Sequence, residues 1–256
     1  MIRGIYTAGS GMMAESIRND VTANNLANAN TVGYKKDVTV VKDFRSMLLN
    51  RINDGSGQAN IGSIGVGAIV DTIAPDQSAG SMRFTGNNLD VAIEGKGFFT
   101  VDTPNGVRYT RNGAFSLNSQ GDLVTRDGYR VLGTGGPINL ADAKKITISE
   151  DGRVMTSNDT QGAAGYNEAG TLQIVTFADE KQLSKEGANL FQASPGAQTD
   201  QSTALVREGT LEQSNVNVVS EMVNMIAGYR AFEIDAKMVQ SHDELLDKAV
   251  NDVGKV

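Results

Sequence analysis

The C-terminal region of the chain carries a hydrophobic pattern that repeats at a constant interval. A sustained period of about 3.5 residues predicts a long helix that packs along another helix, whereas an ordinary amphipathic helix has a wider apolar stripe that drifts over such a length. The sequence therefore predicts a coiled-coil-like helix at this end. Its positions follow a 3-4-3-4 spacing, and only Asp243 among them is polar: Met222, Met225, Tyr229, Phe232, Ala236, Val239, Asp243, Leu246, Val250 and Val253.

The N-terminus supplies a candidate partner for this helix. Gly9 and Gly11 each weaken a helix by up to about 1 kcal/mol relative to alanine, yet the apolar residues still predict a helix from about Ile2 to Asn28. Residues 1–36 have a net charge of +2 and residues 215–256 a net charge of -3, which permits pairing of the two ends. The apolar face is broader and less regular than the C-terminal one: Ile2, Ile5, Met12, Met13, Ile17, Val21 and Leu26.

The middle of the chain has the pattern of antiparallel strands joined by tight turns. Strand-forming runs flank Pro104-Asn105-Gly106 and Asp127-Gly128, and two further runs, "TLQIVTF" and "NLFQAS", predict more strands. We therefore expect an α+β fold, in which paired N- and C-terminal helices bracket a mainly antiparallel β domain. The alternative, with both helices lying on the β domain, fits a regular heptad poorly.

This pattern divides the chain into three expected parts. Residues 1–36 and 214–256 would form a discontinuous helical assembly domain, and residues 81–213 would form the core β domain. Residues 37–80 would form an extended arm or linker, because the stretch from 53 to 67 is poor in hydrophobic residues. Two helices that pair only with each other leave apolar surface open, which indicates assembly with other molecules.

Charge and composition exclude several classes of partner. The net charge of -7 makes nucleic acid and anionic membranes unlikely partners. No apolar run approaches the roughly 20 residues of a membrane-spanning helix, so we expect no membrane insertion. Glu15, Arg18 and Asp20 interrupt the N-terminus where a cleaved secretory signal would have its apolar region. We therefore expect a protein that stays in the cytoplasm or is exported without a cleaved signal peptide.

The residues also give little support to an enzyme. The chain has no cysteine and a single histidine, His242, which has no second histidine with which to share a metal. "EGKGFF" at 94–99 fails as a phosphate-binding loop because Asp90 and Gly97 stand where glycine and Ser or Thr are required. We expect no catalytic residues, no cofactor and no metal. The sequence does not exclude a cell-wall hydrolase, whose catalytic pair of carboxylates could be brought together by the fold.

Three blocks of sequence resemble the bacterial flagellar rod and hook protein family. The N-terminal block is "NNLANANTVGYKK" at 24–36, and the C-terminal block is "SNVNVVSEMVNMIAGYRAFE" at 214–233. Between them, "LDVAIEGKGFFTV" at 89–101 and "YTRNGAFSLNSQGDLVTRDGYRVLG" at 109–133 resemble the shared core domain. The resemblance covers nearly the whole chain, in order.

The resemblance implies a structural subunit of the flagellar basal-body rod. Subunits of this family assemble helically around a central export channel with their terminal helices innermost, transmit torque from motor to hook, and leave through the type III export apparatus without a cleaved signal. The implied partners are other copies of the chain, neighbouring rod and hook proteins, and the export apparatus. The chain is too short for the hook subunit, and "IYTA" at 5–8 favours the proximal rod slightly over the distal rod.

On this interpretation the two terminal motifs form the assembly interface. Asparagine offers donors and an acceptor without net charge, which suits a partly wet contact between subunits, and methionine adapts to slightly different neighbours. A frayed helix end, helix capping and ordinary core packing remain alternatives, and so does a secreted β-rich adhesin or surface-layer protein. The expected interface residues are Asn24, Asn25, Leu26, Asn28, Gly33, Asn215, Val216, Asn217, Met222, Met225, Ile226, Tyr229 and Phe232.

Overall fold

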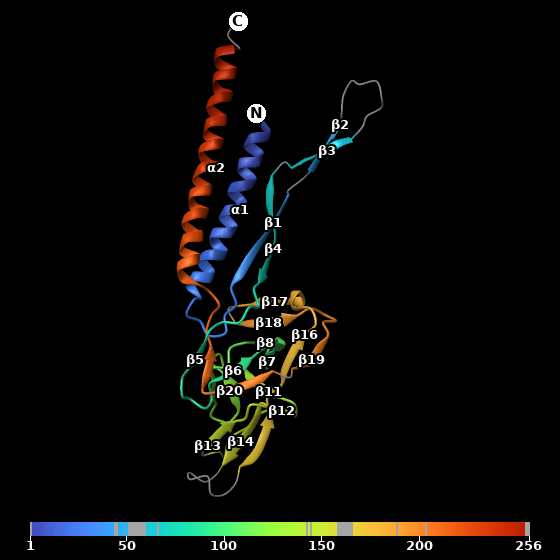
Figure 1. Ribbon diagram of the computed structural model, residues 1–256, viewed down its shortest axis with the longest axis vertical. Helices are drawn as coiled ribbons and strands as arrows, with labels where there is room; N and C mark the ends of the chain where they lie inside the picture. The colour runs from blue at the N-terminus through green and yellow to red at the C-terminus, as the bar shows by residue number, and fades with distance from the viewer. Residues whose placement is uncertain are drawn as a thin grey trace. The chain divides into compact units, whose positions relative to one another are not determined.

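The structure, a computed structural model, forms two compact units (Figure 1). The helical unit comprises residues 1–27, 37–74 and 217–256, and the β unit comprises residues 28–36 and 75–216. This grouping places the segment from 37 to 74 with the helices; the three-part division expected above stays a prediction. The structure describes residues 2–43, 46–50, 60–65, 67–141, 143, 145–157, 166–187, 189–202 and 204–253.

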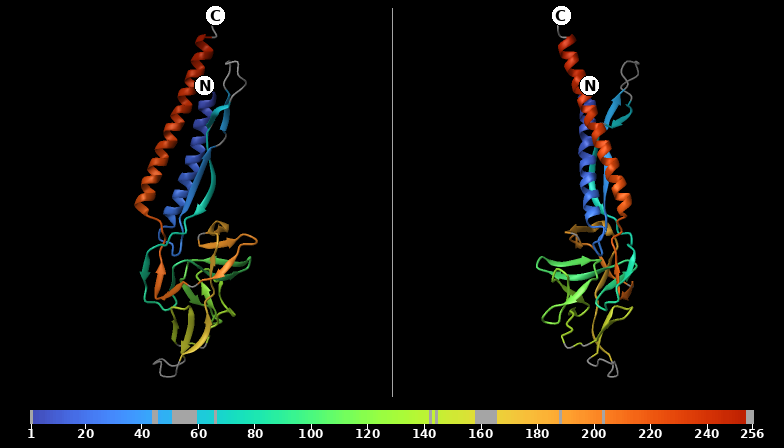
Figure 2. Two further views of the ribbon diagram at one scale, coloured as in Figure 1. Left: turned by 45° about the vertical axis from the view of Figure 1, so that its right-hand side comes forward. Right: turned by 90° about the vertical axis from the view of Figure 1, so that its left-hand side faces the viewer.

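The helical unit is built on two long helices, α1 (Ile2–Ala27) and α2 (Val218–Val253), which lie side by side (Figures 1 and 2). The predicted pairing of the chain ends is therefore confirmed, and the N-terminal helix ends one residue before the expected Asn28. In the described part of the chain, no helix combines the length and apolar character that crossing a membrane requires.

Small residues let the two helices approach closely, and the contacts show that they run antiparallel. A β-carbon on Gly4 would lie 2.5 Å from Nε2 of His242, near the end of α2. A β-carbon on Gly228, near the start of α2, would lie 2.3 Å from Oδ1 of Asn19. Gly11 faces Asp235 between these two contacts. Glycine at these positions therefore leaves room for polar side chains between the helices.

The heptad predicted on α2 has the observed period, but four of its ten positions are exposed. Of the predicted seam, Met222, Tyr229 and Val250 are exposed by 48%, 61% and 70%, and Asp243 is exposed as well. Gly228 and His242, each one position before an exposed residue of the predicted seam, face Asn19 and Gly4 of α1 instead. The less exposed line on α2 thus follows a 4-3 spacing through Glu221, Met225, Gly228, Phe232, Asp235, Val239, His242, Leu246 and Ala249.

Two strand pairs complete the described part of the helical unit. Strand β1 (Asp37–Asp43) pairs with β4 (Ala68–Pro75), and β2 (Ser46–Asn50) pairs antiparallel with β3 (Asn60–Gly65). The extended arm expected at 37–80 is therefore formed in part by paired strands. Of the stretch predicted to be a loop or an arm, residues 53–59 and 66 lie outside the described residues.

The β unit is a set of short antiparallel strands. Its main sheet has the order β17-β18-β8-β7-β11-β10-β9, with β16 also on β7; smaller sheets are β13-β14-β15, β20-β6 and β21-β5. The elements are β5 (Met82–Phe84), β6 (Val91–Glu94), β7 (Phe98–Thr103), β8 (Gly106–Thr110), β9 (Phe115–Leu117), β10 (Leu123–Thr125), β11 (Arg130–Gly133), β12 (Gly136–Pro137), β13 (Lys145–Ile148), β14 (Arg153–Ser157), β15 (Asn167–Thr171), β16 (Ile174–Phe177), the 3-10 helix η1 (Glu180–Gln182), β17 (Leu183–Glu186), β18 (Leu190–Ala193), β19 (Thr199–Gln201), β20 (Leu205–Glu208) and β21 (Thr210–Glu212).

The predicted turns join the strands that the sequence indicated. The β7–β8 hairpin closes with Thr103 opposite Gly106, whose φ of 101° is the left-handed conformation that glycine tolerates. Gly128 joins β10 to β11 with a φ of 86°. The two further runs form β16 and β18, so the predictions for the middle of the chain are confirmed.

Neighbouring side chains of strand β7 point to opposite faces of the sheet. Its first four residues are all buried, so both faces of the strand are covered. Phe99 packs edge-on against Phe115 at 5.1 Å between ring centroids, and Phe98 packs against Phe191 at 5.4 Å on the other face. The larger core lies around Phe99 and is formed by Val91, Ile93, Phe99, Val101, Phe115, Leu123, Val131, Ile138, Leu140, Ile148, Val154, Leu172, Ile174 and Val206.

Replacing Phe99 tests this core. Phe99 is 0% exposed, so Phe99→Ala should lower the free energy of unfolding by about 3–5 kcal/mol through lost burial and a cavity. Phe84 in β5 is 78% exposed, and Phe84→Ala should change it by no more than about 0.5 kcal/mol. Urea denaturation followed by circular dichroism measures both; equal losses would contradict the described core.

Candidate assembly site

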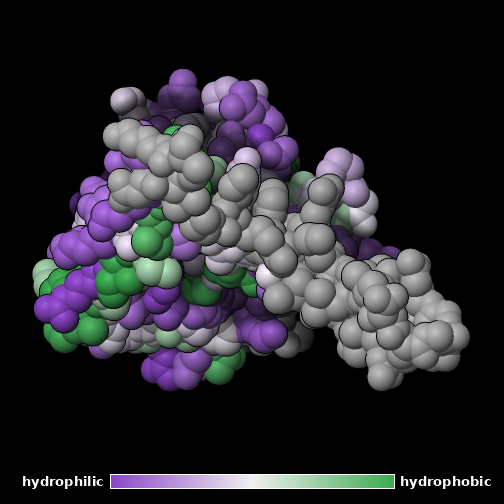
Figure 3. All heavy atoms as spheres, turned by 90° about the horizontal axis from the view of Figure 1, so that it is seen from above, coloured by the Kyte–Doolittle hydropathy of each residue, from purple (hydrophilic) through white to green (hydrophobic). Residues whose placement is uncertain are grey.

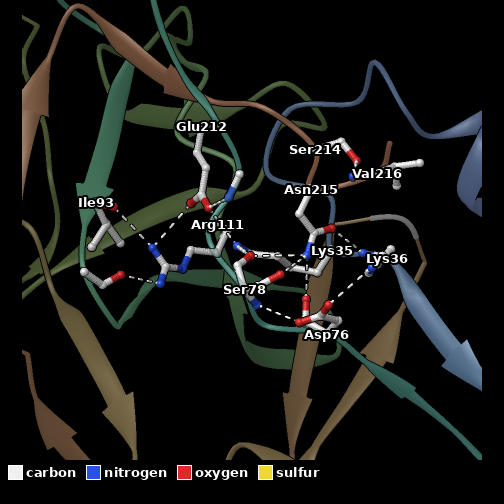
Figure 4. A network of polar contacts seen from close by, with 12 residues as sticks. Lys35, Lys36, Asp76, Ser78, Ile93, Arg111, Glu212, Ser214, Asn215 and Val216 are labelled. Atoms are coloured by element: carbon white, nitrogen blue, oxygen red, sulfur yellow. Dashed lines mark hydrogen bonds and ion pairs between the residues drawn. The ribbon is translucent and has the colours of Figure 1, made fainter. Parts of the chain in front are cut away.

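Three stretches of the β unit that are distant in sequence meet at one network of polar contacts (Figure 4). They are residues 33–36, 76–80 and 212–215, and Arg111 reaches them from the end of β8. Figure 4 shows the side chains pointing toward one another. We call this network the clamp; it consists of Lys35, Lys36, Asp76, Ser78, Arg111, Glu212 and Asn215.

The centre of the clamp is a buried ion pair. Nζ of Lys35 lies 2.7 Å from Oε1 of Glu212, and both side chains are 1% exposed. Lys35 also donates to the Ser78 carbonyl at 2.7 Å, and the Gly80 N–H donates to Oε1 of Glu212 at 2.9 Å. These bonds satisfy the two charges in the interior, which a buried ion pair requires. They also tie the three stretches to one another.

Arg111 adds a second buried cation to the same carboxylate. Its Nη1 lies 3.4 Å from Oε2 of Glu212, and its Nη2 donates to the Gly95 carbonyl at 2.6 Å. Burial lowers the pKa of the Lys35 ammonium, and the charge of Glu212 opposes that shift. Burial likewise lowers the pKa of Arg111, again against Glu212. Glu212 is therefore the group that keeps both cations stable in the interior.

Asn215 links the edge of the clamp through backbone groups. Its Oδ1 accepts from the Lys36 N–H at 2.8 Å, and its Nδ2 donates to the Asp76 carbonyl at 2.9 Å. The Ser78 N–H donates to Oδ1 of Asp76 at 2.9 Å, which lowers the pKa of that carboxyl group. Asn215 thus acts as a connector inside one chain, and its predicted role in a contact between subunits stays a proposal.

Gly33 is required by a close approach next to the clamp. Its φ is 69°, and a β-carbon there would lie 2.5 Å from the backbone nitrogen of Asn112. Its N–H donates to the Glu212 carbonyl at 2.8 Å. The turn predicted at Gly33 is therefore present, and it also brings the chain against β21.

The other asparagines of the motifs fall into separate environments. Asn25 is 2% exposed and exchanges two hydrogen bonds of 2.8 Å with the backbone of Asp37. Asn28 accepts from the Thr31 hydroxyl at 3.2 Å, and Asn217 caps α2 by accepting from the Ser220 N–H at 3.1 Å. The side chain of Asn24 on α1 is exposed. Much of the motif's polar capacity is thus used within the chain.

The apolar residues of the C-terminal motif lie on two sides of α2. Met225 and Phe232 are half-buried toward α1, and Leu26 and Val216 are half-buried as well. The opposite side of the first turns is apolar and exposed; we call it the outer patch. Figure 3 shows exposed hydrophobic side chains as green areas among hydrophilic ones. The outer patch consists of Val219, Met222, Val223, Ile226 and Tyr229, which are exposed by 71%, 48%, 60%, 56% and 61%.

Sequence reasoning missed the charged centre of the clamp. Lys35 and Glu212 are 177 residues apart, and neither stands in a local pattern that indicates burial. Arg111 follows a hairpin strand in which an exposed arginine would be ordinary. Only Lys35 could have been singled out from the sequence, because it follows Gly33 and Tyr34 in the N-terminal motif. Its place in that motif does not indicate that Glu212 is its ion-pair partner.

Family models match three regions of the chain. They are described as flagella basal body rod protein (residues 5–35), flagellar hook protein FlgE/F/G D1 domain (residues 92–156) and flagellar basal body rod FlgEFG protein C-terminal (residues 207–252). Lys35, Arg111 and Glu212 lie one in each region. The clamp therefore joins all three matched regions.

Similar proteins extend over nearly the full length. The flagellar basal-body rod protein FlgG of Bacillus subtilis is 38% identical over 98% of this chain and 99% of its own length. FlgG of Agrobacterium fabrum is 35% identical over 95% and 97%, and the flagellar hook-basal body complex protein FlhO of Bacillus subtilis is 32% identical over 100% of both. These names give no position along the rod, so the preference for its proximal part stays a prediction.

Removing the clamp carboxylate tests its importance. Glu212→Gln leaves two buried cations without a counterion, so the free energy of unfolding should fall by about 3–5 kcal/mol. The matched control is Glu94→Gln, which breaks an ion pair with Arg207 whose side chains are 49% and 59% exposed. The control should show no measurable loss in urea denaturation. Similar results for the two variants would contradict the clamp.

Proposed function

The chain belongs to the flagellar basal-body rod protein family, and we propose that the outer patch and the clamp are the features with which it performs its mechanical role. It is a structural subunit of the rod and is located in the flagellar basal body. Its partners are other rod and hook proteins. The adhesin and surface-layer alternative has no support among the relatives.

The observation that carries the proposal is the outer patch. Five apolar side chains on successive turns of α2 are about half exposed or more. The contact between the two helices, in contrast, includes the polar side chains of Asn19 and Asp235. A contiguous apolar area at the surface is stabilised when another molecule covers it. Stacking against neighbouring subunits would bury the outer patch and hold the long helices in place. The proposed assembly is helical, around a central export channel.

Two further details suit repeated contacts between subunits. Met222 has three rotatable bonds and can fit slightly different neighbours. Asn24 offers hydrogen-bonding groups without a charge that burial would penalise. Of the predicted interface, we therefore propose Asn24, Met222, Ile226 and Tyr229 for contact with neighbouring subunits.

Membership of the rod protein family also suggests how the chain is exported and whether it is an enzyme. We propose export by the flagellar type III apparatus without a cleaved signal, and no enzymatic activity. The net charge of -7 disfavours nucleic acid, and we propose no insertion into membranes. Transmission of torque would depend on helices that are rigid because their apolar faces are buried between subunits.

A charge in the outer patch should abolish assembly. Ile226→Asp places a carboxylate where an apolar neighbour is expected, so cells with this variant should build no motile flagella. Ser241→Asp adds the same charge at an exposed position of α2 outside the patch and should leave swimming intact. Motility assays and electron microscopy of basal bodies measure both. Motile cells with Ile226→Asp would argue against the outer patch as an interface.

The terminal helices should gain protection only on assembly. In the dilute monomer the two helices pack only on each other and no neighbouring subunit covers the outer patch, and a helix of this kind is stabilised mainly by packing. Amide hydrogen exchange should therefore be fast in α1 and α2 and slow in β7 and β8. The assembled protein should protect all four elements. Slow exchange in α1 and α2 of the monomer would contradict this part of the proposal.

A further inference from the structure

A pocket in the β unit is lined by residues with polar groups that have no hydrogen-bond partner in the described part of the chain. Its volume is about 450 Å³, and its wall includes Gln77, Lys96, Phe98, Arg111 and Glu180. The pocket lies beside the clamp, because Arg111 belongs to both. It has no part in the proposed contact through α2.

Arg111 lines this pocket and has one hydrogen-bonding group without a partner among the described residues. The side chain is 6% exposed, and its Nη1 and Nη2 donate to Glu212 and to backbone carbonyls. Its buried Nε–H has no acceptor. The Nε–H and a neighbouring Nη2–H form the fork that binds a carboxylate through two parallel hydrogen bonds. A buried donor without an acceptor is costly, so a ligand here would gain more than at the surface.

Gln77 offers a second unused group at the same wall. Both the oxygen and the nitrogen of its side-chain amide are buried without a hydrogen-bond partner. The amide nitrogen is a neutral donor that can add a third bond to an oxyanion. The ring of Phe98, 5.4 Å from Cζ of Arg111, covers the face of the guanidinium and leaves its edge as the binding direction.

Positive charge exceeds negative charge around the pocket and the adjoining clamp. Buried charges are stable only when they are paired. Lys36 and Lys96 are paired with Asp76 and Glu180, so Lys35 and Arg111 share the single carboxylate of Glu212. The resulting local excess of one positive charge, in a chain whose net charge is -7, favours an anion. The charged groups of the pocket and the clamp are the cations Lys35, Lys36, Lys96 and Arg111 and the carboxylates Asp76, Glu180 and Glu212.

The carboxylates of the pocket wall are already engaged. Asp76 accepts from the Ser78 N–H and pairs with Lys36 at 3.6 Å. Glu180 pairs with Lys96 at 3.3 Å. Neither forms a hydrogen bond or ion pair with Arg111 among the described contacts, so the Nε edge is left for an external group.

We propose that this pocket is a carboxylate-binding subsite, in which the Nε edge of Arg111 and the amide of Gln77 hold the two carboxylate oxygens. The carboxylate is either an acidic side chain of a neighbouring subunit or a small free carboxylate. The binding chemistry is the same for both sources, and it does not depend on assignment to the rod.

Acetate is the probe for this chemistry. The dilute full-length protein, with ¹⁵N-labelled arginine, is titrated with sodium acetate against sodium chloride at equal ionic strength, and the Nε–H signal of Arg111 is followed by NMR. The expected result is a saturable shift with acetate and none with chloride. The Arg83 signal, from an exposed side chain, should stay unchanged in both.

Variants separate the named groups. Gln77→Leu should weaken acetate binding about threefold to tenfold, the effect of one lost neutral hydrogen bond. Glu180→Gln should tighten binding, because it removes the carboxylate that competes for the pocket. Arg153→Gln, an exposed change in β14, is the matched control and should have no effect.

Three results would overturn the proposal. An unmoved Arg111 signal in the native protein would mean that the pocket takes no carboxylate. A shift that appears only in Glu180→Gln would mean that the chain's own Glu180 fills the site. An equal shift with chloride would mean that general screening, and no carboxylate recognition, acts on Arg111.

The source of the carboxylate is tested in cells. If a neighbouring subunit supplies it, Gln77→Leu should reduce swimming while the monomer keeps its stability, and this arm rests on the proposed function. If a free carboxylate fills the site, Gln77→Leu should swim normally although its monomer binds acetate less tightly. Failure of the rod assignment would leave the acetate titration of the monomer unaffected.

Discussion

The ion pair between Lys35 and Glu212 determines how the β unit holds the chain segments that lead into the helices. Both side chains are 1% exposed, and each also bonds to the stretch from 76 to 80. The stretches from 33 to 36 and from 212 to 215 continue in the chain toward β1 and α2. Because a buried charge is stable only with its partner, the three stretches are stable together. A buried ion pair of this kind specifies one arrangement of the chain more than it adds net stability.

Periodicity and turn chemistry in the sequence predicted the elements well, because both are local properties. The 3-4 spacing located α2, and Asn105-Gly106 and Asp127-Gly128 located two hairpins. The phase of the heptad was wrong because it depends on the partner helix. Gly228 of α2 faces Asn19 of α1, and the neighbouring Tyr229 is 61% exposed. Hydrophobicity alone cannot indicate that a glycine faces an asparagine.

The candidate site was predicted only in part. The resemblance identified the terminal motifs, and Ile226 and Tyr229 do lie on an exposed apolar surface. The asparagines were interpreted as one interface, but Asn25 and Asn215 bond within the chain. The partner of Lys35 is 177 residues away in sequence, and no short-range pattern reports such a contact. Long-range polar networks therefore required the structure.

The clamp stabilises the β unit internally, and the outer patch of α2 is the apolar surface proposed for contact with other subunits. Immunogold labelling of flagellar basal bodies, purified from cells that make this chain, tests directly whether the chain is built into the rod. We expect gold particles on the rod, and their position would show whether the chain lies in the proximal or the distal part. Basal bodies without label, with the protein recovered elsewhere at the cell surface, would contradict it.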